Sequence, residues 1–302
     1  MSAIETNQLS KSYRTRKWGR VDALQELTLS VAEGEVFGFL GPNGAGKSTT
    51  IKALMGLITP SGGSAVLAGV PVGDPTCRNS VGYLPENPAF YDFLTAREYL
   101  AFVARMFAMS CEDTRGAIAR VLGLMELQDA ADRPIREFSK GMVQRLGLAQ
   151  AMLHDPEIYI LDEPMSGLDP LGRALVKNII KELKSRGKTV FFSTHITADV
   201  EVVCDRVGVI AKGKLQTVDA VQDVLIKGIE GYYVQVRGID SFSFENVSVQ
   251  GKGAQTLEIY LQRDALSRAL ERLNQVGAEI VLIEPKRKDL ESFFLDIVAR
   301  GN

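Results

Sequence analysis

The stretch GPNGAGKS, residues 41–48, contains the residue types that most clearly suggest a chemistry. It fits the pattern G-x-x-x-x-G-K-S/T and stands between an apolar run at 36–40 and a segment, 47–58, with apolar residues at helical spacing. Such glycines let backbone N–H groups surround an anion, and the following helix adds a partial positive charge. Lys47 can then reach the outer phosphates of a nucleotide, and Ser48 can bind Mg²⁺. The alternative is a glycine-rich turn before a helix.

Two adjacent carboxylates follow a second apolar run and could complete such a site. The run IYILD, residues 158–162, reads as a buried strand, so Asp162 lies at its tip, where a carboxylate can help to hold Mg²⁺. Glu163 is the next residue and points elsewhere, so near the terminal phosphate it could orient or deprotonate an attacking water. The alternative is a pair of surface acids before a proline.

A third apolar strand, KTVFFST, ends just before His195. Parallel sheets bind ligands at the carboxyl ends of their strands, so this position favours a hydrogen bond from His195 to the terminal phosphate or the attacking water. A lone histidine is otherwise most often structural. That structural interpretation is kept for His154, which ends a helical pattern.

The stretch FSKGM, residues 138–142, opens the helical pattern GMVQRLGLAQAML. Serine is a favoured residue for capping a helix, so Ser139 could satisfy the first backbone N–H groups. The same N–H groups and hydroxyl could instead bind an anion such as a phosphate. The residues alone leave both interpretations open.

The elements that carry these residues predict an α/β fold with a largely parallel sheet. The sequence before residue 36 reads as short strands, and residues from about 95 to 155 carry three helical patterns that predict a helical insert. Beyond about residue 225, alternating strand patterns and two amphipathic helices predict a small α+β domain. We therefore expect one domain over 1–222 and a second over 223–302.

Composition excludes several classes of protein. The 302 residues are 45% hydrophobic and 24% charged, which is typical of a globular protein. The net charge of -2 predicts no nucleic-acid partner, and the short basic clusters are expected to be solvated surface. Three unpaired cysteines suit a reducing compartment, and no apolar run is long enough to cross a membrane.

The ordered set GPNGAGKST, YLPEN, FSKGMVQR, ILDEP, SGLDP and STH resembles the nucleotide-binding subunit of ABC transporters over residues 1 to about 220. The resemblance implies a P-loop NTPase fold with an antiparallel β subdomain and a helical insert. It also implies ATP hydrolysis with Mg²⁺, powering transport through separate membrane-spanning permease subunits. A second ATPase subunit, expected to be an identical chain, and a peripheral position on the cytoplasmic face of the cell membrane follow from the same resemblance.

The resemblance also implies a role for each matching residue. Tyr13, or less favourably Trp18, corresponds to the aromatic residue that stacks on adenine, Glu163 to the catalytic base and His195 to the switch histidine. The larger sets are the phosphate loop (Gly41, Pro42, Asn43, Gly44, Ala45, Gly46, Lys47, Ser48 and Thr49), the signature that contacts the nucleotide of a second chain (Ser139, Lys140, Gly141 and Met142), the loop that communicates across the dimer (Ser166, Gly167, Leu168 and Asp169) and the metal-binding set (Ser48, Asp162 and Glu86).

The sequence departs from the family pattern at two places. The usual glutamine after YLP is Glu86, which can still bind Mg²⁺ or hold water and is also expected to act in catalysis. In the signature, Lys140 and Met142 replace a glycine and a glutamine, while the capping hydroxyl and the backbone N–H groups are kept. With both departures, the sequence resembles the exporter-type branch of the family, which includes drug and polysaccharide efflux ATPases. In that branch a small C-terminal domain is common; here it could regulate, dimerise or dock.

The segment ENPAFYDFLTAREYL, residues 86–100, raises the question of a partner. The aromatic residues of Phe90–Phe93 are expected to form a docking surface for a membrane subunit, whereas Tyr99 and Phe102 are expected in the core. The alternative function is a non-transport ABC ATPase. Repair members of the family carry long coiled coils and translation factors carry two ATPase halves, and neither pattern occurs in this sequence.

Overall fold

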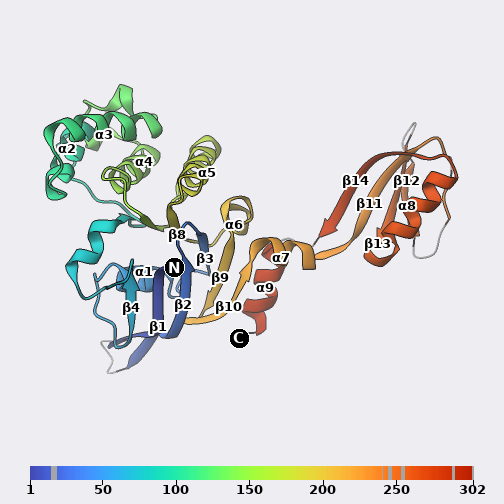
Figure 1. Ribbon diagram of the computed structural model, residues 1–302, viewed down its shortest axis with the longest axis horizontal. Helices are drawn as coiled ribbons and strands as arrows, with labels where there is room; N and C mark the ends of the chain where they lie inside the picture. The colour runs from blue at the N-terminus through green and yellow to red at the C-terminus, as the bar shows by residue number, and fades with distance from the viewer. Residues whose placement is uncertain (15–18, 240, 244–246, 253–255, 288–289, 301–302) are drawn as a thin grey trace. The chain divides into compact units, whose positions relative to one another are not determined.

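A six-stranded sheet forms the centre of the first of two units into which the chain divides, Met1–Ala220 and Val221–Ala299. They are seen in a computed structural model (Figure 1) that describes residues 1–14, 19–239, 241–243, 247–252, 256–287 and 290–300. The order of the strands is β10-β9-β3-β8-β7-β6, and all neighbours are parallel except β9 and β10. These strands are β3 (Val36–Leu40), β6 (Val81–Leu84), β7 (Ile158–Asp162), β8 (Thr189–Thr194), β9 (Arg206–Ala211) and β10 (Lys214–Ala220).

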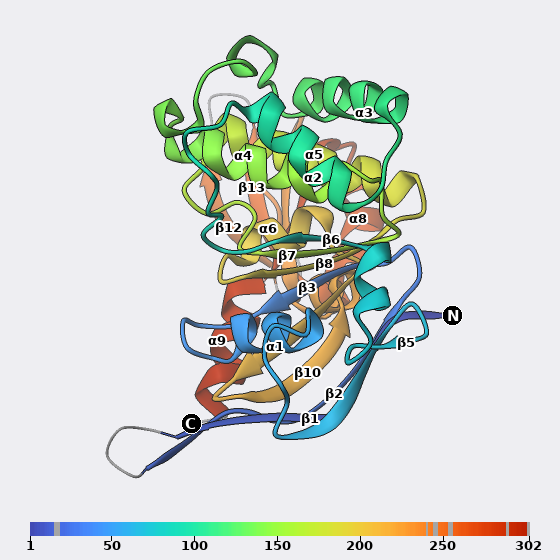
Figure 2. The same cartoon turned by 90° about the vertical axis from the view of Figure 1, so that its left-hand side faces the viewer.

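Both faces of this central sheet are buried, which explains why its strands read as continuous apolar runs. Successive side chains of a strand point to opposite faces. In β7, Ile158 and Ile160 join the core that contains α1 (Lys47–Leu54), whereas Tyr159 and Leu161 join the core beneath the other helices. Figure 2 shows the sheet between helices α2 to α5 on one side and α1 with the antiparallel sheet on the other.

The described residues of this unit form five further helices, and side chains cap most of their first turns. Thr95, Ser110, Ser139 and Asp169 each accept a hydrogen bond from a backbone N–H of the helix that follows. The helices are α2 (Ala96–Met106), α3 (Cys111–Leu124), α4 (Lys140–Ala151), α5 (Pro170–Ser185) and α6 (Thr197–Val203), with 3-10 turns at Pro75–Ser80, Gln128–Ala130 and Ile135–Glu137.

The antiparallel sheet of the first unit has the order β2-β1-β4-β5. Its strands are β1 (Ser2–Arg14), β2 (Arg20–Ala32), β4 (Gly62–Leu67) and β5 (Val70–Pro71). Short strands were expected here, but β1 and β2 have 13 residues each. Gln8 and Glu26 take positive φ angles of 48° and 49° near shifts in the β1–β2 register. These irregularities interrupt the apolar alternation and hide the full length of the strands from the sequence.

The second unit is a four-stranded antiparallel sheet with helices. The order is β12-β13-β11-β14, formed by β11 (Ile229–Arg237), β12 (Val247–Lys252), β13 (Leu257–Gln262) and β14 (Glu279–Arg287). Its helices are α7 (Val221–Lys227), α8 (Leu266–Gln275) and α9 (Leu290–Arg300), with a 3-10 turn at Arg263–Ala265. Ala269 and Leu273 of α8 pack with Val234, Val236 and Ile259 of the sheet. The expected fold class, α/β with a small α+β part, is confirmed.

Candidate active site

The phosphate-binding pattern forms a loop between β3 and α1. Gly44 and Gly46 take φ angles of 78° and 111°, in the left-handed region that favours glycine. A Cβ atom at Gly46 would lie 2.6 Å from the carbonyl oxygen of Ala23, and one at Gly41 would lie 2.6 Å from that of Ile210. The loop is therefore packed against β2 and β9, and these two glycines allow backbone to approach backbone.

Lys47, the first residue of α1, is nearly buried and points back along its own loop. Its Nζ donates to the carbonyl oxygen of Gly41 at 2.7 Å and lies 3.3 Å from Glu163 Oε1. The ion pair joins the loop to the residue that follows β7. A cleft of about 250 Å³ lies over this contact, lined by Ala23, Pro42, Asn43, Gly44, Gly46, Lys47, Ser48, Thr49, Glu86 and Glu163.

The tip of β7 is held by a serine that the sequence analysis did not single out. Ser193 of β8 is fully buried, and its Oγ donates to Asp162 Oδ1 at 2.5 Å while accepting from the Glu163 N–H at 3.0 Å. Asp162 is itself 2% exposed, so its carboxylate depends on such a partner. A polar residue inside the apolar strand KTVFFST was the available signal.

Glu163 combines a strained backbone with a well-placed carboxylate. Its φ of 51° is in the left-handed region, which costs a residue other than glycine about 1–3 kcal/mol. Beyond the Lys47 contact, its Oε2 lies 3.0 Å from His195 Nδ1. The His195 side chain is 47% exposed, so it can reach the solvent edge of the cleft. The two residues expected to act on the attacking water are thus in contact.

The signature residues lie beside the 166–169 loop of the same chain. Ser139 caps α4 by accepting from the Met142 N–H at 3.2 Å, so the capping interpretation is confirmed. A Cβ atom at Gly167, which has a φ of 71°, would lie 2.7 Å from Lys140 Cε. The Lys140 side chain therefore covers this glycine, and Asp169 then caps α5. The signature does not line the cleft of its own chain.

Two other expected site residues, Glu86 and Tyr13, differ in whether they line the cleft. Glu86 lines it, as expected of a residue near the phosphates. Tyr13 pairs with Val21 across β1 and β2, is 40% exposed and lies under Lys11 Nζ at 5.2 Å from its ring centre. It is not among the residues that line the cleft. Trp18 lies outside the described residues.

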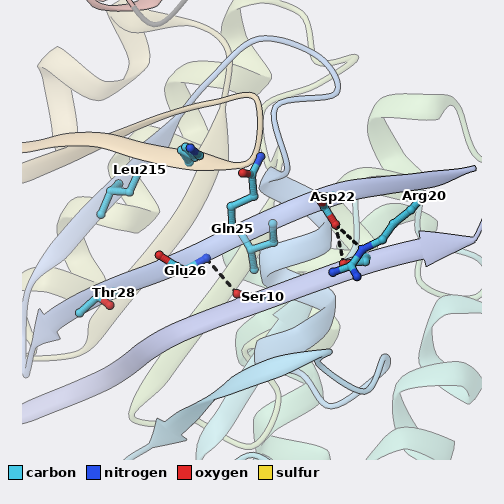
Figure 3. A pocket seen from close by; sticks show the side chains of 10 residues that line it. Ser10, Arg20, Asp22, Gln25, Glu26, Thr28 and Leu215 are labelled. Atoms are coloured by element: carbon cyan, nitrogen blue, oxygen red, sulfur yellow. Dashed lines mark hydrogen bonds and ion pairs between the residues drawn. The ribbon is translucent and has the colours of Figure 1, made fainter.

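A larger groove of about 520 Å³ lies along β1, β2 and β10 (Figure 3). Asp22 accepts there from Ser12 Oγ at 2.6 Å and from Arg20 Nε at 2.8 Å, while Ser10 Oγ accepts from the Glu26 N–H at 2.9 Å. These contacts lower the pKa of Asp22, mainly through Ser12. The residues that line the groove include none from the phosphate loop and none from the β7 tip, so the groove is separate from the cleft over Lys47.

The donor set of the cleft suits a metal ion that is shared with a substrate. Among the described residues, no group of three or more His, Cys, Asp and Glu side chains could hold a metal ion by itself. Mg²⁺ usually takes one or two protein oxygens and completes its shell with phosphate and water. Ser48 and Asp162 offer hard oxygens of this kind. Burial raises the pKa of the neighbouring Tyr83 to about 12, so this phenol stays neutral.

Comparison with known proteins decides the family. The sequence profile of the ABC transporter family matches residues 24–166, which hold the phosphate loop, the signature and both carboxylates. An uncharacterized ABC transporter ATP-binding protein from Synechocystis sp. is 41% identical over 298 residues, covering 97% of this chain and 84% of that protein. The chain belongs to the ABC transporter ATP-binding proteins.

Two further members of the ABC family support the assignment. The bacitracin transport ATP-binding protein BcrA of Bacillus licheniformis is 33% identical over 322 residues, covering 99% of this chain and 98% of that protein. A solved structure of an ATP-binding subunit of an ABC transporter has a TM-score of 0.68 and 32% identity, covering 74% of this chain and 92% of that one. The predicted family, the P-loop fold and ATP binding are confirmed, and the chain is an ABC ATPase.

Within the described part of this ABC ATPase, no helix is both long and apolar enough to span a membrane. ABC ATP-binding subunits work with membrane components.

Proposed function

We propose that the chain hydrolyses ATP to power export through separate membrane-spanning subunits, working as one of two identical chains on the cytoplasmic face of the membrane. The observation that carries this proposal is the Glu163 carboxylate, which lies 3.3 Å from Lys47 Nζ and 3.0 Å from His195 Nδ1 at the edge of one cleft. A phosphate-binding cation, an acid and a histidine meet there. Export is favoured by the similarity to the bacitracin transport protein over nearly the full chain.

ATP and Mg²⁺ fit the oxygen and nitrogen donors of the cleft. The N–H groups of Gly44 to Ser48 and the Lys47 ammonium supply the positive field for the phosphates. Ser48 Oγ and the Asp162 carboxylate would hold Mg²⁺, which neutralises charge on the phosphates. Glu86 lines the same cleft and could supply a further oxygen to the metal or hold a water beside it. Ser193 keeps Asp162 oriented by its short hydrogen bond.

Glu163 and the phosphates of ATP would compete for Lys47, and this competition would free Glu163 to act as a base. The lysine pairs with Glu163 in the structure, and the phosphates of ATP are a stronger anionic partner for the same ammonium. Once Lys47 has turned to the phosphates, the Glu163 carboxylate is free to accept a proton from the attacking water. His195 contacts both oxygens of this carboxylate, at 3.0 and 3.1 Å, so it can orient the base or bind the terminal phosphate.

A second chain would complete the site. The capping Ser139 and the following Lys140 are exposed, so the first N–H groups of α4 can face an anion held by another molecule. Two identical chains related by a two-fold axis would place each signature over the phosphate loop of the other. Lys140, already in contact with Gly167, would then join the signature to the 166–169 loop at the interface.

An exposed aromatic patch offers a docking surface for the membrane partner. The patch consists of Tyr91, Phe93, Phe102 and Met106, which are 55%, 65%, 43% and 73% exposed. Phe90 was also expected on this surface, but it packs against Tyr99 and the core. The ring centres of Tyr91 and Phe102 lie 5.9 Å apart. Phe102 was expected in the core, and this was wrong because only the neighbouring Tyr99 turns inward. Contiguous exposed apolar side chains mark an interaction site, and this favours transport over a role without a partner.

We expect the double variant Tyr91→Ala and Phe93→Ala to lose its membrane partner without losing ATP hydrolysis. The patch holds no residue of the cleft, so turnover by the purified chain should stay within about twofold of native, since exposed sites are mostly neutral. Co-purification of the native chain and the variant with the membrane subunits, from cells that express both, measures docking. Val276→Ala, an exposed apolar change in the second unit, is the control.

Mg²⁺-dependent ATP hydrolysis by the purified native chain tests the proposal as a whole. We expect turnover that is abolished by chelation of Mg²⁺ and altered when the membrane subunits are added. A chain that binds ATP but never hydrolyses it, alone or in the complex, would contradict the proposed function. Retention of the membrane subunits by the Tyr91 and Phe93 variant would contradict the docking surface only.

A further inference from the structure

Gln144 is a buried amide on α4, the helix that the signature begins. It is 4% exposed, and its Nε2 lies 3.3 Å from the carbonyl oxygen of Glu163 and 3.3 Å from that of Pro164. A buried amide nitrogen has two N–H groups to satisfy, and both find partners in these carbonyls. The contact crosses from the helical insert to the end of the catalytic strand β7.

The two carbonyls belong to the stretch where the chain leaves the sheet in a left-handed turn. The Glu163 N–H donates to Ser193 Oγ at 3.0 Å, and its C=O accepts from Gln144 at 3.3 Å. The backbone of Glu163, the proposed base, is thus held on one side by β8 and on the other by α4. Since its φ is 51°, this conformation depends on such outside contacts.

We propose that Gln144 is a positioning residue, which sets the direction of the Glu163 carboxylate and ties it to α4. The inference rests on the proposed function, because it takes Glu163 as the base for hydrolysis. Gln144 is not itself among the residues that line the cleft. It acts through the two carbonyls, so its loss lets the peptide after β7 rotate and moves the carboxylate away from Lys47 and His195.

The contact between Gln144 and Glu163 also connects the signature, at the start of α4, to the proposed base of the same chain. Gln144 follows Ser139 by five residues, which is about 7.5 Å along a helix. A helix of this length moves as a rigid piece, so a shift of its first turn also moves the Gln144 amide. If the nucleotide of a second chain binds the first turn of α4 and shifts it, the position of the Glu163 backbone would therefore change as well. Each site would sense occupancy of the other through α4.

A second glutamine on α4 provides the matched control. Gln150 accepts from the Tyr99 hydroxyl at 2.9 Å, so its hydrogen bond stays between helices of the insert. Gln144→Met and Gln150→Met each remove a side-chain amide from α4, and in each case methionine has nearly the same volume as the glutamine that it replaces. A stabilising role alone would make the two variants alike in activity. A positioning role separates them.

Steady-state ATP hydrolysis by the full-length variants tests the inference. For Gln144→Met we expect kcat to fall by about 10–100-fold, the loss typical of a misplaced catalytic group, with KM for ATP within about twofold of native. Gln150→Met should keep native kcat and KM. Thermal unfolding of both variants shows whether either has lost its fold.

The Glu163→Gln background shows whether Gln144 acts through the base. There, single-turnover hydrolysis should be no slower after Gln144→Met is added, because the positioned carboxylate is already gone. An equal fall in both backgrounds, a rise in KM without a fall in kcat, or an equal loss in Gln150→Met would each overturn the inference. If Gln144→Met fails to fold, Gln144→Glu, which keeps the shape, replaces it in the same comparison. Absence of hydrolysis by the native chain would instead contradict the proposed function.

Discussion

The Glu163→Gln variant is expected to bind ATP as tightly as the native chain and to hydrolyse it about 10²–10⁴-fold more slowly, the range for loss of an acid–base group. An amide keeps the size of the side chain and its contact with His195, but it cannot take a proton from water. It also removes the negative charge beside Lys47, 3.3 Å away, which leaves the lysine free for phosphate. The variant should therefore accumulate in an ATP-bound pair of chains.

Single-turnover hydrolysis and size-exclusion chromatography with ATP measure the two halves of this prediction. Glu157→Gln is the control, since Glu157 precedes β7 at its other end, and its exposed carboxylate pairs with the buried Lys188 outside the cleft lining. Unchanged hydrolysis in Glu163→Gln would remove this residue as the base. Slow hydrolysis together with weak ATP binding would show that its main role is to hold the loop, not to act on water.

The Lys47→Met variant is expected to lose both ATP affinity and hydrolysis. Lys47 is 6% exposed and is the cation within the phosphate loop, so methionine keeps its bulk but leaves the phosphates without their charge partner. Removing one side of a buried charge pair costs about 2–5 kcal/mol, which is a loss in affinity of about 30-fold or more. The Glu163 carboxylate also loses its partner in this variant.

Equilibrium titration with a fluorescent ATP analogue measures the affinity of this variant. Lys52→Met changes an exposed lysine of the same helix and should bind as the native chain does. Native affinity in Lys47→Met would mean that the loop backbone alone holds the phosphates. Thermal unfolding without nucleotide separates this result from a collapse of the loop.

The sequence predicts much of the fold because local pattern and tertiary role agree in it. The apolar runs at 36–40 and 158–162 are found as β3 and β7, and the glycine pattern between β3 and α1 forms a tight loop. Side chains buried on both faces leave a run without alternation, which a single sequence records. Strands β1 and β2 were underestimated because positive φ angles at Gln8 and Glu26 shift their register.

The supports of the site could not be predicted in the same way, because they join residues that are distant in sequence. Ser193 and Asp162 are 31 positions apart, and Gln144 and Glu163 are 19 positions apart. A serine or a glutamine in the sequence does not indicate which distant residue it will contact once the strands and helices are packed together. The exposure of Phe102 could not be predicted either, because it depends on which face of α2 packs against the other helices of the insert. The adenine contact of Tyr13 and the nucleotide contact of the signature stay predictions.

The central claim is that each ATP is hydrolysed between the phosphate loop of one chain and the signature of another. Mixing the inactive Lys47→Met variant with a Ser139→Phe variant tests it most directly, because a mixed pair rebuilds one site from two intact halves. Hydrolysis by an equal mixture should rise to about a quarter of the native rate, since half of the random pairs are mixed and each has one intact site. A rate no higher than the average of the two separate variants would contradict the account.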